Sequence, residues 1–195
     1  MRERQPQFYS DHFFSLTLLP CGAVDRAELN DLARGLSVRG MDVRIAKERP
    51  LPQQAFNPRR RQYRADDFLT IARSQVGGRV LAVTNCDLYA DNLNFVFGLA
   101  DSPGKCAVIS LFRLRMGAEE QTFRRRAEKE AVHEISHTLG MSHCANPRCV
   151  MHFSNSLEDT DRKGAEWCGR CAKQLQRDPK HASQAQTDGG GIWLL

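Results

Sequence analysis

Residues 133–143 read HEISHTLGMSH, and this stretch, more than any other, determines the fold that we expect. Residues four apart share one face of a helix, so His133 and His137 can reach a single metal ion. Val132, Ile135 and Leu139 fall on the other side of that helix. We therefore expect a two-faced helix, with its histidines toward a cleft and its aliphatic side chains toward a core.

Gly140 is placed to end this helix, because glycine tolerates the positive φ of a helix terminus. The chain could then turn back, so that His143 would supply a third nitrogen ligand. Three protein ligands leave zinc a fourth position for water, as in catalytic rather than structural sites. Zinc makes its water acidic, and a nearby carboxylate can accept the proton. Glu134 is the candidate for this general base.

The alternative is an amphipathic helix whose histidines are ordinary surface or core residues. Five fixed positions match by chance in about one sequence in ten thousand of this length. This rarity favours the catalytic zinc site.

Four cysteines follow the histidines as two short-spaced pairs, at Cys144, Cys149, Cys168 and Cys171. Such pairs commonly form a closed, tetrahedral structural zinc site. Disulfide bonds are the competing interpretation. However, residues 1–20 lack the apolar run of a secretory signal, and seven cysteines cannot all pair. We therefore expect a cytoplasmic protein with reduced thiols and a second zinc ion. The other three cysteines, Cys21, Cys86 and Cys106, are expected to pack as small apolar side chains without a chemical role.

The whole pattern over residues 133–171, HExxHxxGxxH-C-x4-C-x-M-x16-C-x-x-C, resembles the archaemetzincins, a metzincin-like family of presumed zinc metallopeptidases. The resemblance implies two zinc ions per chain and Glu134 as general acid/base. It implies a catalytic zinc on His133, His137 and His143, and a structural zinc on Cys144, Cys149, Cys168 and Cys171. Met151 resembles the methionine beneath the metal in such enzymes, although core packing would also explain it.

The elements expected along the chain alternate between strands and helices. Strands are expected at 13–19, 41–46, 80–84, 94–98 and 107–112, and helices at 25–36, 66–75 and 118–139, with a long loop at 49–64. This order predicts an α/β (α+β) fold, with a mixed twisted sheet, packed helices and a long active-site helix. By the resemblance, the fold would be metzincin-like.

We expect one metallopeptidase domain over residues 1–177, with a flexible tail at 178–195. Its N-terminal part, 1–140, would hold the sheet and the active-site helix. Its C-terminal part, 141–177, would be short, irregular and stabilised by the four-cysteine zinc. By analogy with metzincin-like enzymes, the strand at 94–98 would pair with an extended peptide substrate.

The charge balance, 28 basic against 23 acidic residues, is mild. Arginine clusters at 59–61 and 124–126 lack interleaved aromatic residues, so nucleic acid is not an expected partner. No apolar run is long enough for a membrane span, and we expect a monomer. Two functions remain: a zinc peptidase acting on peptides or proteins, and a zinc-stabilised protein that binds protein or nucleic acid with little hydrolysis. Glu134 favours the peptidase, because a structural site has no use for a carboxylate there.

Overall fold

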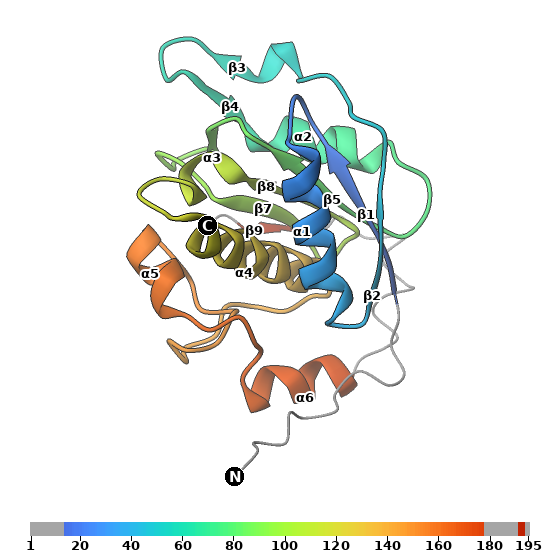
Figure 1. The fold of residues 1–195 in the computed structure, drawn as a ribbon, viewed down its shortest axis with the longest axis vertical. Helices are drawn as coiled ribbons and strands as arrows, with labels where there is room; N and C mark the ends of the chain where they lie inside the picture. The colour runs from blue at the N-terminus through green and yellow to red at the C-terminus, as the bar shows by residue number, and fades with distance from the viewer. Residues whose placement is uncertain (1–13, 178–190, 194–195) are drawn as a thin grey trace.

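The computed structural model describes residues 14–177 and 191–193, and a mixed six-stranded sheet forms its centre (Figure 1). The strand order is β2-β1-β5-β8-β7-β9, in which β2, β1, β5 and β8 are parallel and β7 and β9 are each antiparallel to their neighbour. The strands are β1 (Phe14–Pro20), β2 (Met41–Ile45), β5 (Arg79–Thr84), β7 (Gly98–Ser102), β8 (Cys106–Ser110) and β9 (Gly191–Trp193). A small second sheet joins β3 (Phe56–Asn57), β4 (Gln62–Arg64) and β6 (Leu88–Tyr89).

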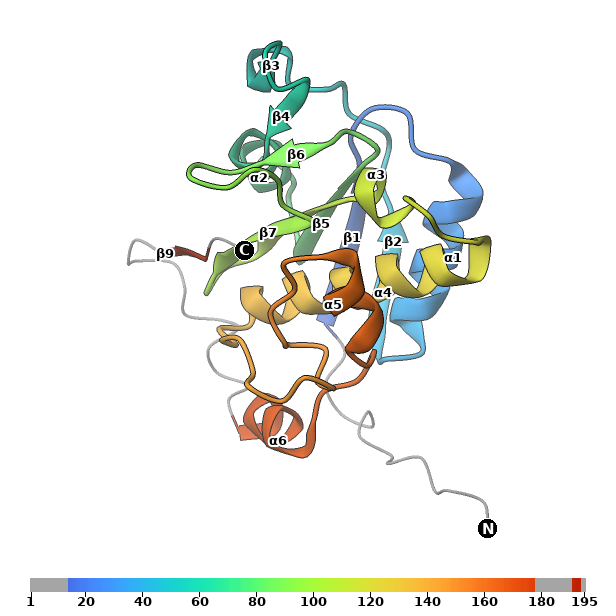
Figure 2. The ribbon, with the colours of Figure 1, turned by 90° about the vertical axis from the view of Figure 1, so that its left-hand side faces the viewer.

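Helices cover both faces of the central sheet, so the fold has three layers (Figure 2). One face carries α1 (Arg26–Ser37) and α4 (Glu120–Thr138), and the other carries α2 (Ala65–Arg73). The strands β5 and β8 are buried along their whole length, because each is apolar on both faces. Two apolar cores result, one on each side of the sheet. This arrangement confirms the mixed sheet with packed helices, including a long helix.

The long helix α4 lies between the sheet and the C-terminal part of the chain. Arg126 donates to both carboxylate oxygens of Asp161, at 2.7 and 2.6 Å, and to the carbonyls of Leu114 and Met116. Lys129 Nζ donates to the Thr160 carbonyl at 3.0 Å. The sheet therefore covers one side of the helix, and the C-terminal part of the chain covers the opposite side. The face that carries His133 and His137 is buried as well.

The described C-terminal part is more regular than expected. It contains α5 (Leu157–Arg162) and α6 (Gly169–Arg177), and α3 (Leu111–Leu114) and a short 3-10 helix (Gln53–Ala55) complete the elements. Ser156 caps α5, because its hydroxyl accepts from the Asp159 amide. The expected loop at 49–64 likewise contains β3 and β4.

The strand expected at 94–98 is wrong. Only Val96 makes an isolated bridge there, to Leu88, and the strand β7 begins at Gly98. The register is set by the apolar residues of β8, with Gly98 opposite Ile109. The charged Asp101 makes the sequence of β7 look like a loop, but in the structure its carboxylate pairs with Arg73. Long-range pairing thus decides a strand that local composition does not indicate.

Local signals elsewhere predict the elements correctly. Asp25 caps α1, its Oδ1 accepting from the Ala27 amide at 2.6 Å, and α4 covers nearly the expected range. Of the expected tail, 191–193 form β9, while 178–190 and 194–195 lie outside the described residues. No helix within the described ranges is long and apolar enough to cross a bilayer.

Candidate active site and metal centres

The last turns of α4 and the loop after it bring three imidazoles together. His133 and His137 lie one turn apart on the helix, and Gly140 has the expected positive φ, 77°. The loop beyond Gly140 returns His143 to the other two rings, so that the three ligand atoms lie within 4.8 Å of one another. The spacing of the motif therefore becomes a three-nitrogen cluster.

Backbone carbonyls fix which ring nitrogens face this cluster. His133 Nδ1 lies 2.8 Å from the Val150 carbonyl, and His137 Nδ1 lies 2.7 Å from the Met141 carbonyl. A carbonyl can only accept, so each Nδ1 carries the proton and each Nε2 keeps its lone pair in the neutral ring. The two Nε2 atoms lie 3.1 Å apart, close to the roughly 3.3 Å that bonds of about 2.05 Å to a tetrahedral zinc would give.

The surroundings keep all three rings neutral. Burial is the main cause that lowers the pKa of His133 well below its ordinary value, lowers that of His137 to about 4, and lowers that of His143. His143 Nε2 is buried without a hydrogen-bond partner, and its ring packs against Phe153 with centroids 5.2 Å apart. Three ring nitrogens converge on one point, and this donor set fits a zinc ion.

Glu134 lies beside this cluster with its carboxylate completely buried. Neither oxygen has a hydrogen-bond partner. Burial first, and then the negative charge of Glu130, raise its pKa well above the ordinary value, while Lys163 opposes this shift. Its side chain packs against the backbone of β7, since a Cβ added at Gly98 would lie 2.6 Å from Glu134 Cγ. The carboxyl group is therefore held in a narrow space and is not consumed by a structural contact.

The four cysteines form a second cluster, with sulfur atoms that all lie within 4.8 Å of one another. Cys144 Sγ and Cys168 Sγ are 3.8 Å apart, and all seven cysteines of the chain are free thiols. Bonds of about 2.3 Å to a tetrahedral zinc place sulfurs roughly 3.8 Å apart, whereas a disulfide needs about 2.05 Å. The geometry fits a metal site and not the alternative of disulfide bonds.

One thiol of this cluster is already acidic. A hydrogen bond with the Cys171 backbone is the main cause that lowers the pKa of Cys168 to about 6. Arg170 adds a positive charge, with Nη2 3.4 Å from Cys144 Sγ. Zinc binds thiolates, so these contacts favour the form that a metal needs at Cys168, whereas burial raises the pKa of Cys149 and of Cys171.

The two clusters share one segment of chain. His143 and Cys144 are consecutive, and the Cys144 amide donates to the Met151 carbonyl at 2.8 Å. Val150, which accepts from His133, lies between Cys149 and Met151. A metal on the cysteines would therefore stabilise the backbone that orients His133.

Sequence reasoning found every histidine and cysteine of the two clusters but not the groups packed around them. Met151 is completely buried, in the core cluster that also contains Cys149, and Cys21 and Cys106 are buried as expected, while Cys86 is partly exposed. No chemistry was expected of His12 and His181, and both lie outside the described residues. The missed residues are Gly98, Glu130, Lys163 and Trp167, whose indole donates to Ser136 Oγ. Glu130 had a signal, since it lies one turn before Glu134, but the others depend on contacts distant in sequence.

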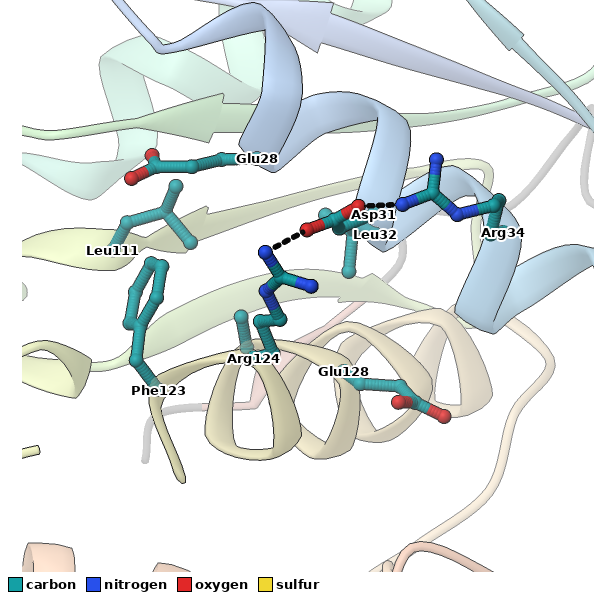
Figure 3. Close-up of a pocket in the computed structure, with 9 residues that line it drawn as sticks. Glu28, Asp31, Leu32, Arg34, Leu111, Phe123, Arg124 and Glu128 are labelled. Carbon is teal, nitrogen blue, oxygen red and sulfur yellow. Dashed lines mark hydrogen bonds and ion pairs between the residues drawn. The ribbon is translucent and has the colours of Figure 1, made fainter. Parts of the chain in front are cut away.

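A separate hollow lies between α1 and α4, and Figure 3 shows its charged walls. Asp31 pairs with Arg34 and with Arg124, and Glu28 accepts from Arg115 at 2.6 Å. Its nine lining residues include no histidine or cysteine. Each of its charged side chains takes part in an ion pair, either within the hollow or with Arg115 or Arg39 beside it.

Comparison with known proteins agrees with this geometry. The model of the family described as Peptidase family M54 matches residues 56–177, which is more than half of the chain. An archaemetzincin of Natronomonas pharaonis is 40% identical over 169 residues, covering 81% of this chain and 97% of the relative. One from Methanocaldococcus jannaschii is 47% identical over 131 residues, covering 65% and 73%.

Solved structures show the same fold. The archaemetzincin of Methanopyrus kandleri superposes with a TM-score of 0.77 at 36% identity, covering 89% of this chain and 97% of that one. The archaemetzincin of Archaeoglobus fulgidus, solved with malonate, gives a TM-score of 0.74 at 38% identity, covering 82% and 99%. This chain therefore belongs to peptidase family M54, the archaemetzincins, and is a zinc metallopeptidase.

Proposed function

We propose that the protein hydrolyses peptide bonds with Glu134 as the general acid/base and with two zinc ions. His133, His137 and His143 would hold the catalytic zinc, and Cys144, Cys149, Cys168 and Cys171 the structural one. The observation that carries the proposal is the convergence of three ring nitrogens on the helix that also carries the completely buried carboxyl group of Glu134.

When bound, zinc supplies a Lewis acid for the peptide carbonyl and lowers the pKa of water. Glu134 takes a proton from the attacking water and later donates it to the nitrogen of the leaving amine. Burial supports this exchange, because the raised pKa makes the Glu134 carboxylate a stronger proton acceptor. Val150 and Met141 hold His133 and His137 by their Nδ1–H groups, so the rings cannot turn away from the metal.

The alternative, a zinc-stabilised binding protein with little hydrolysis, is less well supported. A buried carboxyl group without partners destabilises the fold, and a protein that only binds would not need one beside its metal. Membership of a peptidase family also favours hydrolysis.

Metal analysis tests the two-zinc part of the proposal. The wild-type protein should contain two zinc ions per chain, and His137→Ala and Cys168→Ser should each contain one. Loss of both ions in the Cys168→Ser variant would show that the sites are not independent. One ion per chain in the wild type would contradict the proposal.

Digestion of a diverse peptide library tests the role of Glu134. Glu134→Gln should lower kcat by about 10²–10⁴-fold, the usual contribution of a general acid/base, and should keep its zinc. Glu119→Gln is the matched control, because Glu119 is exposed at the start of the same helix. Equal cleavage by wild type and Glu134→Gln would refute the assignment.

We further infer that the protein works as a monomer in the cytoplasm on peptides or proteins. The seven free thiols support a reducing compartment. Size-exclusion chromatography with light scattering should give the mass of one 22.1 kDa chain, and fractionation should recover the protein with soluble markers.

A further inference from the structure

A buried lysine reaches the active-site helix from the C-terminal part of the chain. The side chain of Lys163 has 0% exposure, and its Nζ lies 3.6 Å from Glu130 Oε2, in a side chain with 2% exposure. The Lys163 amide donates to the Asp159 carbonyl, and the Gly164 amide donates to the Arg148 carbonyl. A Cβ at Gly164 would lie 2.7 Å from the Arg148 oxygen, so the backbone beside Lys163 is closely packed. The position of this ammonium is therefore fixed by the fold.

The Lys163–Glu130 ion pair is not expected to stabilise the fold by itself. Burying an ammonium and a carboxylate costs several kcal/mol each, and their attraction offsets this only with good hydrogen bonds. Yet Lys163 Nζ and Glu130 Oε2 have no hydrogen-bond partner. In the described part of the chain, nine buried side-chain atoms lack one, and four of these belong to Glu130, Glu134 and Lys163. Such a concentration of unsatisfied groups indicates function rather than packing.

Glu130 stands between the lysine and the site. It precedes Glu134 by four residues and His133 by three, so the three side chains share one face of α4. Because Lys163 Nζ lies 3.6 Å from Glu130 Oε2, the positive charge of Lys163 lies close to this face of α4. The ion pair thus influences both the metal ligands and the carboxyl group.

We propose that Glu130 and Lys163 are positioning residues: the lysine fixes the Glu130 carboxylate beside Glu134, and the pair sets the metal affinity of the three histidines. This inference rests on the proposed function of Glu134. Without Lys163, the Glu130 carboxylate beside Glu134 would lose its charge partner, and Glu134 would be displaced from the metal side. Without Glu130, an unpaired ammonium would oppose the binding of a cation.

The two halves of the pair therefore have opposite effects on the metal. Lys163→Met, of similar length, should bind a divalent ion at least as tightly as the wild type, and Glu130→Gln should bind it more weakly. We expect the affinities of these two variants to differ by about tenfold or more, since a unit charge close to a divalent ion in a buried site changes its energy by more than 1.4 kcal/mol. The double variant Glu130→Gln/Lys163→Met should return to within about threefold of the wild type, because it restores neutrality.

The experiment is a cobalt(II) titration of the full-length, metal-free variants. Thiolate and imidazole sites give different absorption bands, so the histidine site is followed separately. Lys47→Met, at an exposed lysine, is the control. The value of kcat is then measured at saturating zinc on a peptide that the wild type cleaves, and it should fall at least tenfold in the double variant, because that variant lacks the fixed Glu130 carboxylate beside Glu134.

The order of affinities decides the inference. Equal affinities in Lys163→Met and Glu130→Gln would overturn it, as would wild-type kcat in the double variant. If Lys163→Met fails to fold, the double variant still tests both predictions, because it leaves no buried charge unpaired. A wild type that cleaves no peptide would refute the proposed function instead, and the order of affinities would still test the charge pair.

Discussion

Replacement of Gly98 by alanine should disable catalysis without removing either metal. Gly98 is the first residue of β7 and has no positive φ, so alanine fits its backbone. The new methyl group would, however, lie 2.6 Å from Glu134 Cγ and 2.7 Å from Glu134 Oε1. Ordinary contacts begin at about 3.4 Å, so the carboxyl group must move by roughly 0.8 Å or more.

The magnitude follows from this displacement. A misplacement of about 1 Å in a reacting group typically costs about 10²-fold in rate, so kcat should fall by about that factor. KM should change little, because the histidines are not touched. Glu134 is 0% exposed and has no empty space to enter, so the unfolding free energy should also fall, by about 1–3 kcal/mol for such overpacking.

The assay is hydrolysis of a peptide from the library digest, with zinc content measured on the same sample. Gly169→Ala is the control, since a Cβ there meets nothing within 4 Å and the residue has no positive φ. If Gly98→Ala kept two zinc ions and wild-type kcat, the close approach of β7 to Glu134 would have no role in catalysis, and the reasoning would be refuted.

Three further predictions concern stability. Cys149→Ser, or chelation of the wild type, should lower the unfolding free energy by more than about 3 kcal/mol and admit protease to the 144–171 segment, as followed by limited proteolysis. The metal-free protein should lose stability as pH falls from about 6.5 to 4, because His137 stays neutral when folded, with a pKa of about 4, and takes up a proton when unfolded. The loss should approach about 3 kcal/mol in urea titrations and be smaller in His137→Gln. Arg126→Met should cost about 2–3 kcal/mol, since it leaves Asp161 and two carbonyls without their partner, and should leave kcat unchanged below the melting temperature.

The residues that the sequence identifies are those whose roles are local. The spacing of His133 and His137 is a property of any helix, and Gly140 ends that helix for a reason that concerns its own φ. The two short-spaced cysteine pairs are also visible without a fold. These signals predict the donor atoms of both clusters and the long helix that carries the first one.

The residues that the sequence does not identify act across the fold. Lys163 meets Glu130 only because α5 lies against α4, and Gly98 meets Glu134 only because β7 is the strand beside that helix. The failed strand at 94–98 has the same origin, since its true start depends on the register with β8. Glu130 is the exception, because helical spacing from Glu134 could have revealed it.

The short strand β9 gives the sheet a protected boundary. It pairs with β7 at Ala100, Asp101 and Ser102, whose amides and carbonyls would otherwise form an open edge. At the opposite boundary β2 has no partner strand among the described residues, but it carries the exposed charges of Asp42 and Arg44. Open edges recruit strands from other molecules, and charged side chains discourage this. The sheet thus ends in a strand of only three residues at one boundary and in a charged strand at the other.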